Sequence, residues 1–535
     1  MKVGVIGGSK LAEDYVRAAS SLDPFYGASY RAPGSFRTRA EHLDSRFGQH
    51  GREEVAVLLE SCGVEQDQIR RWVEGRGYVV TTGQQPGLFG GPLYSLYKGL
   101  SAIAAARALE QELHRPVLPL FWIASEDHDW DEAGTIKVLD SKNRLSQVTL
   151  EVEEEHRHRP IFRVPLSEEI DQVLEAFLSL HPDTDFSSDL HEMLRSGFRR
   201  GRTLSDGFQA FIETHLGPLG LHVVPAHDPV LKERSRPMLL RELDAAEERE
   251  TELNRTADEL SKLGYSIQVP ILPGGVNIFF EGPAGRERLY RDGPGTFHLR
   301  HSGERVTRGE VEEAAARDPS VLSPNVLLRP VVENSLFPVL GYVAGPGEIQ
   351  YYSQLRPVFE GHDLEMPIVL PRHSVTLVER KIGKVLDKFA LDLEQLSRPH
   401  HELAAELTRE EMPEDIRKTL EGLRARVHEA GDELLQGVQS IDATLAGPVE
   451  HARNQTFQSF EEVEKKILQA LKRQNEIALA QVEKAQIHLF PEGKPQERVL
   501  NPVYYLVRYG PDLVRHLLDA FEAAPPTPFV PEQST

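Results

Sequence analysis

The segment TGQQPGLFGGPLYSLYK, at residues 82–98, gathers residue types that suit an anion site. Glycines let backbone amides approach a ligand closely. A helix that begins at Pro92 would point its free amides and partial positive charge at this loop. The spacing is not that of the phosphate-binding motif G-x-x-x-x-G-K-[ST], and a tight turn that needs glycine only for its geometry is the alternative. The residues predicted to bind a phosphate or carboxylate are Gly83, Gln84, Gln85, Gly90, Gly91, Tyr94 and Lys98, the last two sharing one helix face.

A second segment, EDHDWDE at residues 126–132, places five carboxylates and a histidine directly after a strongly apolar run. Crowded carboxylates repel one another, so such a cluster persists where a cation or an ammonium group offsets the charge. His128 could act as a general base, or could bind phosphate when protonated. A solvated acidic turn is the alternative. No H-E-x-x-H or comparable ligand spacing appears, so no zinc site is predicted.

A third block, at residues 323–355, carries polar side chains within otherwise apolar sequence. Gly345-Pro346-Gly347 repeats the pattern of glycines at a helix start. An arginine at position 329 could clamp a carboxylate or phosphate through two parallel hydrogen bonds. The alternative is a buried ion pair of Arg329 with Glu333 or Glu348. The predicted ligand-binding residues of this block are Asn325, Arg329, Glu333, Gly345, Gly347, Glu348 and Gln354.

These segments follow elements that would bring them together. A strand at 77–82, a helix at 93–113 and a strand at 116–125 have the spacing of a β-α-β unit, which predicts a parallel sheet. Ligands of such sheets bind beyond the carboxyl ends of the strands, where the first two segments lie. The N-terminal VGVIGG is a weaker candidate, because it lacks the third glycine of G-x-G-x-x-G. Further strands are expected at 135–140, 221–228, 266–272 and 365–372, helices around 203–215 and 229–263, and an antiparallel excursion at 277–300.

The character of the chain changes after about residue 374. Apolar residues between 413 and 445 alternate in steps of four and three, which is a heptad seam. Gly447-Pro448 interrupts the pattern, and a second helical run follows through residues 457–477. This pattern predicts an antiparallel helical hairpin. Such a hairpin is thin, so we expect it to mediate dimerisation, with packing against the α/β part of the same chain as the alternative.

Composition limits the possible functions. A chain of 535 residues is long enough for several structural units, and a net charge of −22 disfavours non-specific nucleic-acid binding. Cys62 is the single cysteine, which excludes an intrachain disulfide and a cysteine-based zinc cluster, and its neighbours suggest an inert thiol. No signal peptide and no apolar run of about 18 residues is found, so a cytoplasmic protein without a membrane span is expected.

Together these segments resemble a known family. TGQQPGLFGGPLYSLYK, PLFWIASEDHDWDE, SPNVLLRP, GYVAGPGEIQYYSQL and LFPEGKPQERVLNPVYYLVRYG are similar to the bacillithiol-biosynthesis cysteine-ligase family BshC, in order from about residue 77 to the end. The resemblance implies an α/β fold with a Rossmann-like parallel-sheet core related to class I aminoacyl-tRNA synthetases, connecting-peptide insertions and a C-terminal coiled coil that supports a homodimer. The implied parts are an N-terminal segment (1–76), the core (77–373, with insertions at about 150–220 and 277–320), the hairpin (374–488) and a returning C-terminal segment (489–535).

The resemblance also implies an activity, a ligase that joins L-cysteine to the amine of glucosaminyl-malate. Activating the cysteine carboxylate suggests ATP as cosubstrate, with Mg²⁺ as a further expectation. The implied catalytic residues are Lys98, Asp127, His128 and Asp129; Glu126 would help to hold amines or Mg²⁺, Arg329 the malate carboxylates, and Lys494 or Arg498 the nucleotide.

Two features depart from the related enzymes. The chain lacks the HIGH and KMSKS signatures of class I synthetases, and it cannot form a cysteine-dependent zinc site. Three other readings therefore stay open. They are another ATP-dependent amide-forming synthetase or nucleotidyltransferase, a divalent-metal hydrolase that uses EDHD, and a non-catalytic scaffold built on the coiled coil.

Overall fold

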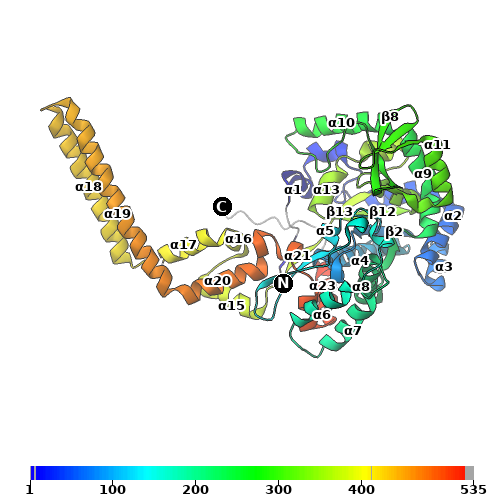
Figure 1. The fold of residues 1–535 in the computed structure, drawn as a ribbon, viewed down its shortest axis with the longest axis horizontal. Coiled ribbons are helices and arrows are strands. Elements are labelled where there is room, and N and C mark those ends of the chain that lie inside the picture. Colours follow the sequence, from blue (N-terminus) through cyan, green and yellow to red (C-terminus); the bar gives the residue numbers. More distant parts are fainter. Residues whose placement is uncertain (1, 5–7, 411, 525–535) are drawn as a thin grey trace. The chain divides into compact units, whose positions relative to one another are not determined.

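The computed structural model describes residues 2–4, 8–410 and 412–524. The chain forms two compact units. The first comprises residues 1–376 with 497–535, and the second comprises residues 377–496. Figure 1 shows the helices and strands of each unit.

A five-stranded parallel sheet lies at the centre of the first unit, with the strand order β13-β12-β2-β3-β6. Its strands are apolar and largely buried, as expected for a sheet covered on both faces. The chain runs from β2 to β3 and β6 on one side, then returns to β12 and β13 on the other, so the strand order reverses beside β2. A Rossmann-like parallel sheet is thereby confirmed. Its strands are β2 (Tyr78–Gln84), β3 (Val117–Ile123), β6 (His222–Pro225), β12 (Val339–Ala344) and β13 (Ile368–Pro371).

The crossover helix α4 (Tyr94–Leu113) connects β2 to β3 and packs on both strands. Its opposite side contacts α23 (Asp512–Ala523), where Tyr97 meets Phe521 edge-on with ring centroids 5.9 Å apart. Two covered sides explain why this helix is apolar almost all round. The C-terminal segment therefore returns to the core.

N-terminal helices cover the β12–β13 side of the sheet. The buried Arg39 guanidinium donates twice to the carbonyl oxygen of Val339, and the Tyr15 hydroxyl donates to that of Val369 at 2.7 Å. The strand β1 (Lys2–Gly4) pairs antiparallel with β14 (Ser374–Thr376), so it does not belong to the parallel sheet. Residues 5–7 of VGVIGG lie outside the described residues. The helices are α1 (Lys10–Val16), α2 (Ser35–Ser61) and α3 (Gln66–Glu74).

Two insertions flank the central sheet. The first is helical, and the second is the predicted antiparallel excursion, which extends to five strands in the order β10-β9-β8-β7-β11. The predicted helices around 203–215 and 229–263 are present, the latter as two. The elements are α6 (Glu169–Ser179), α7 (Ser187–Gly197), α8 (Leu204–Leu216), α9 (Pro229–Asp244), α10 (Ala246–Lys262), β7 (Gly275–Gly282), β8 (Gly285–Gly293), β9 (Thr296–Leu299), β10 (Arg305–Thr307), α11 (Arg308–Arg317) and β11 (Leu322–Pro324).

Two predicted strands of the parallel sheet are wrong. The segment 135–140 forms β4 (Thr135–Leu139), which pairs antiparallel with β5 (Leu145–Thr149) in a separate hairpin. The Asp140 carboxylate accepts the amides of Lys142 and Arg144 at 2.8 Å, and this tight turn reverses the chain before any crossover. The segment 266–272 contains no strand. Pro270 interrupts it, and the Gln354 side chain bonds both the amide and the carbonyl group of Val269.

The second unit is entirely helical. The predicted antiparallel hairpin is confirmed, because α18 and α19 lie side by side and ion pairs of 2.6 Å (Arg424–Glu464) and 2.9 Å (Arg453–Asp432) join them in opposite order. Pro448 lies in the first turn of α19, where a missing amide costs nothing. The helices are α15 (Arg380–Phe389), α16 (Leu393–Leu396), α17 (His400–Glu410), α18 (Glu414–Gln439), α19 (Ala446–Gln474) and α20 (Glu476–Leu489).

Two other predictions concern the chain as a whole. No helix in the described ranges has the length and hydropathy that a membrane crossing requires. Cys62 is inert at neutral pH, because burial raises the pKa of its thiol to about 12.

Candidate active site

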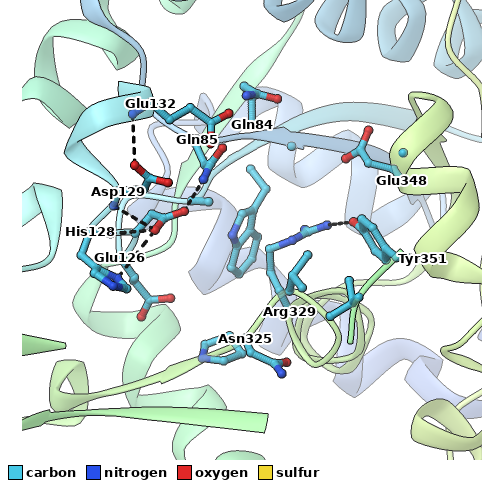
Figure 2. A pocket seen from close by; sticks show the side chains of 18 of the residues that line it. Gln84, Gln85, Glu126, His128, Asp129, Glu132, Asn325, Arg329, Glu348 and Tyr351 are labelled. Atoms are coloured by element: carbon cyan, nitrogen blue, oxygen red, sulfur yellow. Dashed lines mark hydrogen bonds and ion pairs between the residues drawn. The ribbon is translucent and has the colours of Figure 1, made fainter. Parts of the chain in front are cut away.

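A pocket of about 920 Å³ lies at the carboxyl ends of the parallel strands. Residues that follow four strands line it: 83–85 at the end of β2, 126–132 after β3, 345–348 after β12 and Arg372 after β13. The strand order reverses at β2, and such a point is where open α/β sheets bind ligands. Figure 2 shows Glu126, His128 and Asp129 along one side, and Arg329, Tyr351 and Glu348 along the other.

The acidic side is shaped by local capping. Asp129 begins the one-turn helix α5 (Trp130–Ala133), and its carboxylate accepts the amide of Glu132 at 3.1 Å. The Asp127 carboxylate accepts the amides of His128 and Asp129 and a short hydrogen bond from the Gln85 side chain. Burial raises the pKa of Asp127, but the charge of Arg286 and the hydrogen bond from Gln85 outweigh burial and leave the pKa lowered. Asp127 is therefore an ionised residue that shapes the loop.

His128 is neutral at physiological pH. Burial, followed by the charge of Arg286, lowers the pKa of His128 to about 4. Arg286 Nη1 lies 3.2 Å from His128 Nδ1. Since arginine can only donate, Nδ1 accepts and the proton resides on Nε2. In this arrangement the ring offers a ligand a hydrogen-bond donor, which weakens its predicted role as a general base.

Glu126 and Glu132 have different environments. Glu126 forms a short ion pair with the buried Lys232, so the negative charge of Glu126 is already compensated. Lys232 also donates to the carbonyl of Leu322. Glu132 is exposed as a residue, yet protein atoms surround its carboxyl group. That burial, together with the charges of Asp129 and Asp127, raises the pKa of Glu132. A carboxylate of raised pKa in a pocket is a candidate general base.

Lys98 is fully used by protein acceptors. Its ammonium group donates to the Gly83 carbonyl at 2.6 Å and to Gln84 Oε1 at 3.0 Å, and it lies 2.9 Å from Glu348 Oε2. Tyr94 lies one turn earlier and accepts from Gln84 Nε2 at 3.3 Å. The two residues therefore share a helix face, as predicted. Lys98 holds Gln84 and Glu348 in place and has no donor left for a ligand anion.

Arg329 forms the buried ion pair that the sequence left open. Arg329 Nη1 lies 2.7 Å from Glu333 Oε2, and Nη2 donates to the hydroxyls of Tyr342 and Tyr351. Asn325 Oδ1 accepts the amides of the two leucines that precede α12 (Arg329–Leu336), so this side chain fixes the helix start. Both residues line the pocket, but the contacts described above are with other residues of the protein and serve its structure.

Other predicted site residues do not line the pocket. Glu333 is buried behind Arg329, and Gln354 is buried against Val269. Lys494 belongs to the second unit and is not among the lining residues. The residues that the structure does bring together are Gly83, Gln84, Gln85, Tyr94, Lys98, Glu126, Asp127, His128, Asp129, Asn325, Arg329, Gly345, Gly347, Glu348 and Arg498.

The glycine loop is wrongly predicted as an anion cradle at Gly90 and Gly91. Gly90 has a φ of +94°, and a Cβ there would lie 2.5 Å from the Phe211 ring, so this glycine permits close packing under α8. Asn501 donates to the carbonyls of Phe89 and Gly91 at 3.0 and 2.8 Å. The amide before α4, on Leu93, donates to the carbonyl of Leu500. The C-terminal segment, rather than a ligand, satisfies this loop.

The sequence analysis missed four lining arginines, which are Arg157, Arg286, Arg288 and Arg372. Arg372 directly follows β13, so the rule about strand ends could have found it. It pairs with Glu497 in the short helix α21 (Gln496–Val499), which also carries Arg498 to the pocket. Arg286 and Arg288 come from β8 of the antiparallel insertion. Their spacing of two residues could have shown that both side chains lie on one face of a strand. The neighbouring sequence, however, does not indicate that this strand lies beside the pocket.

Comparison with known proteins places these features in a family. The family model described as "Bacillithiol biosynthesis BshC, N-terminal Rossmann-like domain" matches residues 2–373, and "Bacillithiol biosynthesis BshC, C-terminal coiled-coil domain" matches residues 375–526. The chain belongs to the BshC family. Two relatives called "Putative cysteine ligase BshC" are each 32% identical to this chain. The match to the Salinibacter ruber protein covers 95% of this chain and 93% of the relative, and the match to the Chlorobaculum tepidum protein covers 96% and 94%. A Bacillus licheniformis BshC is 27% identical over 95% of this chain and 94% of its own. These names agree with the prediction of a ligase.

Among the described residues, one group of three potential metal ligands is close enough to share an ion. It consists of Glu153, Glu155 and His156, which do not line the pocket. Both glutamates are exposed, and exposed acidic groups commonly lie together without an ion. In the pocket itself, the Asp127 carboxylate bonds Gln85 and backbone amides, and the Glu126 carboxylate bonds Lys232.

Proposed function

We propose that this protein is a carbon–nitrogen ligase that joins the carboxyl group of L-cysteine to the amine of glucosaminyl-malate, with ATP activating the carboxylate. Membership of the BshC family supports the class of reaction. The observation that carries the proposal is the opposition of charges in one pocket. Carboxylates after β3 suit an ammonium group, and guanidinium groups from β8 and α21 suit anions.

The chemistry requires an amine that loses a proton as it attacks. In the activation step a carboxylate oxygen of cysteine would attack a phosphorus atom of ATP and displace ADP or pyrophosphate, so that this oxygen becomes part of a phosphate or AMP leaving group. The amine nitrogen then forms the new bond to the carbonyl carbon, the leaving group departs with its electron pair, and one proton passes to a base. Glu132 suits this base, because burial and neighbouring carboxylates raise its pKa. His128 Nε2–H suits hydrogen bonding to the carbonyl oxygen as its negative charge grows.

A nucleotide fits only part of the predicted site. The amides of the glycine loop bond within the protein, so the phosphates would depend on side chains. Arg498 is exposed at the pocket rim beside Tyr94, whereas Arg372 is engaged by Glu497. Arg498 is the better candidate for a phosphate contact, and the exposed carboxylate of Asp129 suits Mg²⁺.

The direct test incubates the purified protein with ATP, cysteine and glucosaminyl-malate. Mass spectrometry should detect bacillithiol together with AMP or ADP. AMP would indicate an adenylate and ADP an acyl phosphate. Absence of both the amide and nucleotide turnover, with folded protein and fresh substrates, would contradict the proposal. Glucosamine in place of glucosaminyl-malate is the matched control that separates this ligase from another amide-forming synthetase.

We also propose that the α18–α19 hairpin mediates a homodimer. Leu434 and Ile441 of the hairpin region are 54% and 78% exposed, and Val463 is 48% exposed, so its apolar seam is incompletely covered. Light scattering should give twice the chain mass for the wild type and a monomer for Leu434→Glu with Ile441→Glu. The matched control is Gln436→Glu, which changes an exposed polar residue on the same helix. A monomeric wild type would contradict this assignment.

A further inference from the structure

Two arginines of the antiparallel insertion face the pocket side by side. Arg286 and Arg288 lie two positions apart on β8, so their side chains project from the same face of the strand. Both line the pocket. The residues between and after them, Glu287 and Leu289, are buried on the opposite face. The fold therefore presents a pair of guanidinium groups to the cavity.

Arg286 is held rigidly in place. Its Nε donates to the Ser323 hydroxyl at 2.8 Å and its Nη2 to the Pro324 carbonyl at 3.0 Å. The guanidinium carbon lies 3.8 Å from the ring centroid of Phe279, and Nη1 reaches His128. These partners are neutral. Among the described residues, no carboxylate oxygen lies within 4.0 Å of this buried cation, although Asp127 and Glu126 act on it from further away.

Arg288 is less engaged. Its Nε donates to the Val276 carbonyl at 2.8 Å, and its two terminal nitrogens have no acceptor in the part of the chain that the structure describes. The side chain is half-buried, and burial lowers the pKa of the guanidinium. Burying cations without an anion is unfavourable, so a pair of this kind suits a ligand that brings the negative charge.

We propose that Arg286 and Arg288 bind the two carboxylates of the malate group, while the substrate ammonium group faces Asp129 and Glu132. This inference rests on the proposed function and names the recognition element for one substrate. It also moves the malate site from Arg329, whose guanidinium is taken by Glu333 and two tyrosines, to the inserted sheet. Arginine matches carboxylate oxygens through paired N–H donors, and two arginines match a dicarboxylate.

The neighbouring charges favour a dicarboxylate over a triphosphate. Asp127 and Glu126 lie on the same side of the pocket as Arg286 and contribute to its electrostatic environment. They would repel the higher charge of a triphosphate more strongly. A molecule with an ammonium group at one end and carboxylates at the other complements both the acidic residues and the arginines of the pocket. Phe279 and the exposed Val326 supply apolar surface for the carbon atoms between them.

Calorimetric binding to the full-length protein tests the assignment. The probes are glucosaminyl-malate and methyl glucosaminide, which carries the amine without carboxylates. Arg288→Met should weaken glucosaminyl-malate binding about tenfold or more, because charged hydrogen bonds are lost, and should leave methyl glucosaminide within about twofold. Arg288→Lys should recover part of the loss. Arg305→Met, in the exposed strand β10 of the same sheet, is the matched control.

Arg288 is the primary variant, because its terminal nitrogens have no acceptor among the residues that the structure describes, whereas Arg286→Met also removes contacts to Ser323 and Pro324. Equal binding of glucosaminyl-malate by wild type and Arg288→Met would overturn the assignment. A rise in KM for ATP alone would do the same, since it would place phosphates there. Carboxylate-dependent binding by a protein that forms no amide would support the dicarboxylate site while contradicting the proposed reaction.

Discussion

Replacing Lys98 with methionine should destabilise the first unit in a pH-dependent way. The substitution keeps an unbranched side chain but removes the cation beside Glu348. Burial raises the pKa of Glu348, while Lys98, the Tyr342 hydroxyl and the Gly345 amide outweigh burial and lower it. Without Lys98 the buried carboxyl will take up a proton. Protonating a carboxyl group whose ordinary pKa is 4.5 costs about 1.4 kcal/mol of folding free energy for each pH unit above that pKa, or about 3 kcal/mol at pH 7.

The sign of the pH dependence follows from the same change. In the wild type, the lowered pKa of Glu348 contributes stability that is present above pH 4.5 and is lost as pH falls through the folded-state pKa. In Lys98→Met the folded-state pKa is raised instead. The variant therefore loses stability as pH rises, and its deficit relative to wild type should shrink to about 1 kcal/mol near pH 5. The unmade hydrogen bonds to Gly83 and Gln84 account for a smaller, pH-independent loss.

Tryptophan fluorescence during urea unfolding measures this effect. The chain has 3 tryptophans, Trp72, Trp122 and Trp130, and all belong to the first unit, so the signal reports that unit. Combining Lys98→Met with Glu348→Gln should recover most of the loss at pH 7, because no buried charge remains. Lys142→Met, at an exposed position, is the control. A loss below about 1 kcal/mol at pH 7, or equal losses at pH 5 and 7, would refute the reasoning.

Three further predictions concern other residues. Since the pKa of His128 is lowered to about 4, the pH profile of kcat/KM should show no inflection near pH 6.5 that depends on His128. Arg286→Met should raise the pKa of His128 and introduce such an inflection. An inflection that is present in the wild type and absent from His128→Gln would contradict the prediction. Glu132→Gln should lower kcat by about a hundredfold with little change in KM, because a general base contributes at that scale, and an unchanged kcat would remove Glu132 from the mechanism. Gly90→Ala should lower the free energy of unfolding in urea by about 2 kcal/mol or more, because alanine would be held at a φ of +94° with its Cβ 2.5 Å from the Phe211 ring. An unfolding midpoint equal to that of the wild type would contradict this prediction.

The site could be predicted from sequence where its residues follow parallel strands. Gln84 ends β2, and Asp127 and Glu348 follow β3 and β12, so a general rule about strand ends places these residues together. Arg288 could not be placed this way, because it depends on how an inserted sheet packs against the core. Local chemistry likewise could not show that Arg329 is neutralised, although its spacing from Glu333 left that alternative open.

The fold shows the same distinction between local and distant causes. The strand prediction at 266–272 rests on apolar residues and gives too little weight to Pro270, which interrupts them. The glycine loop was misinterpreted for a different reason. Its backbone partner, Asn501, lies 412 positions after Phe89 in the sequence, so no local pattern could show that the loop is already satisfied.

That long separation also sets an order of events during synthesis of the chain. Translation proceeds at roughly 5–20 residues per second, so about 20–80 s pass between the appearance of Phe89 and that of Asn501. Throughout this interval the carbonyl groups of Phe89 and Gly91 lack their final donor. A nascent chain that ends between residues 371 and 501 contains all five strands of the parallel sheet but cannot close the loop beside the pocket. The ribosome thus releases the whole helical unit before this enzyme can complete its active site.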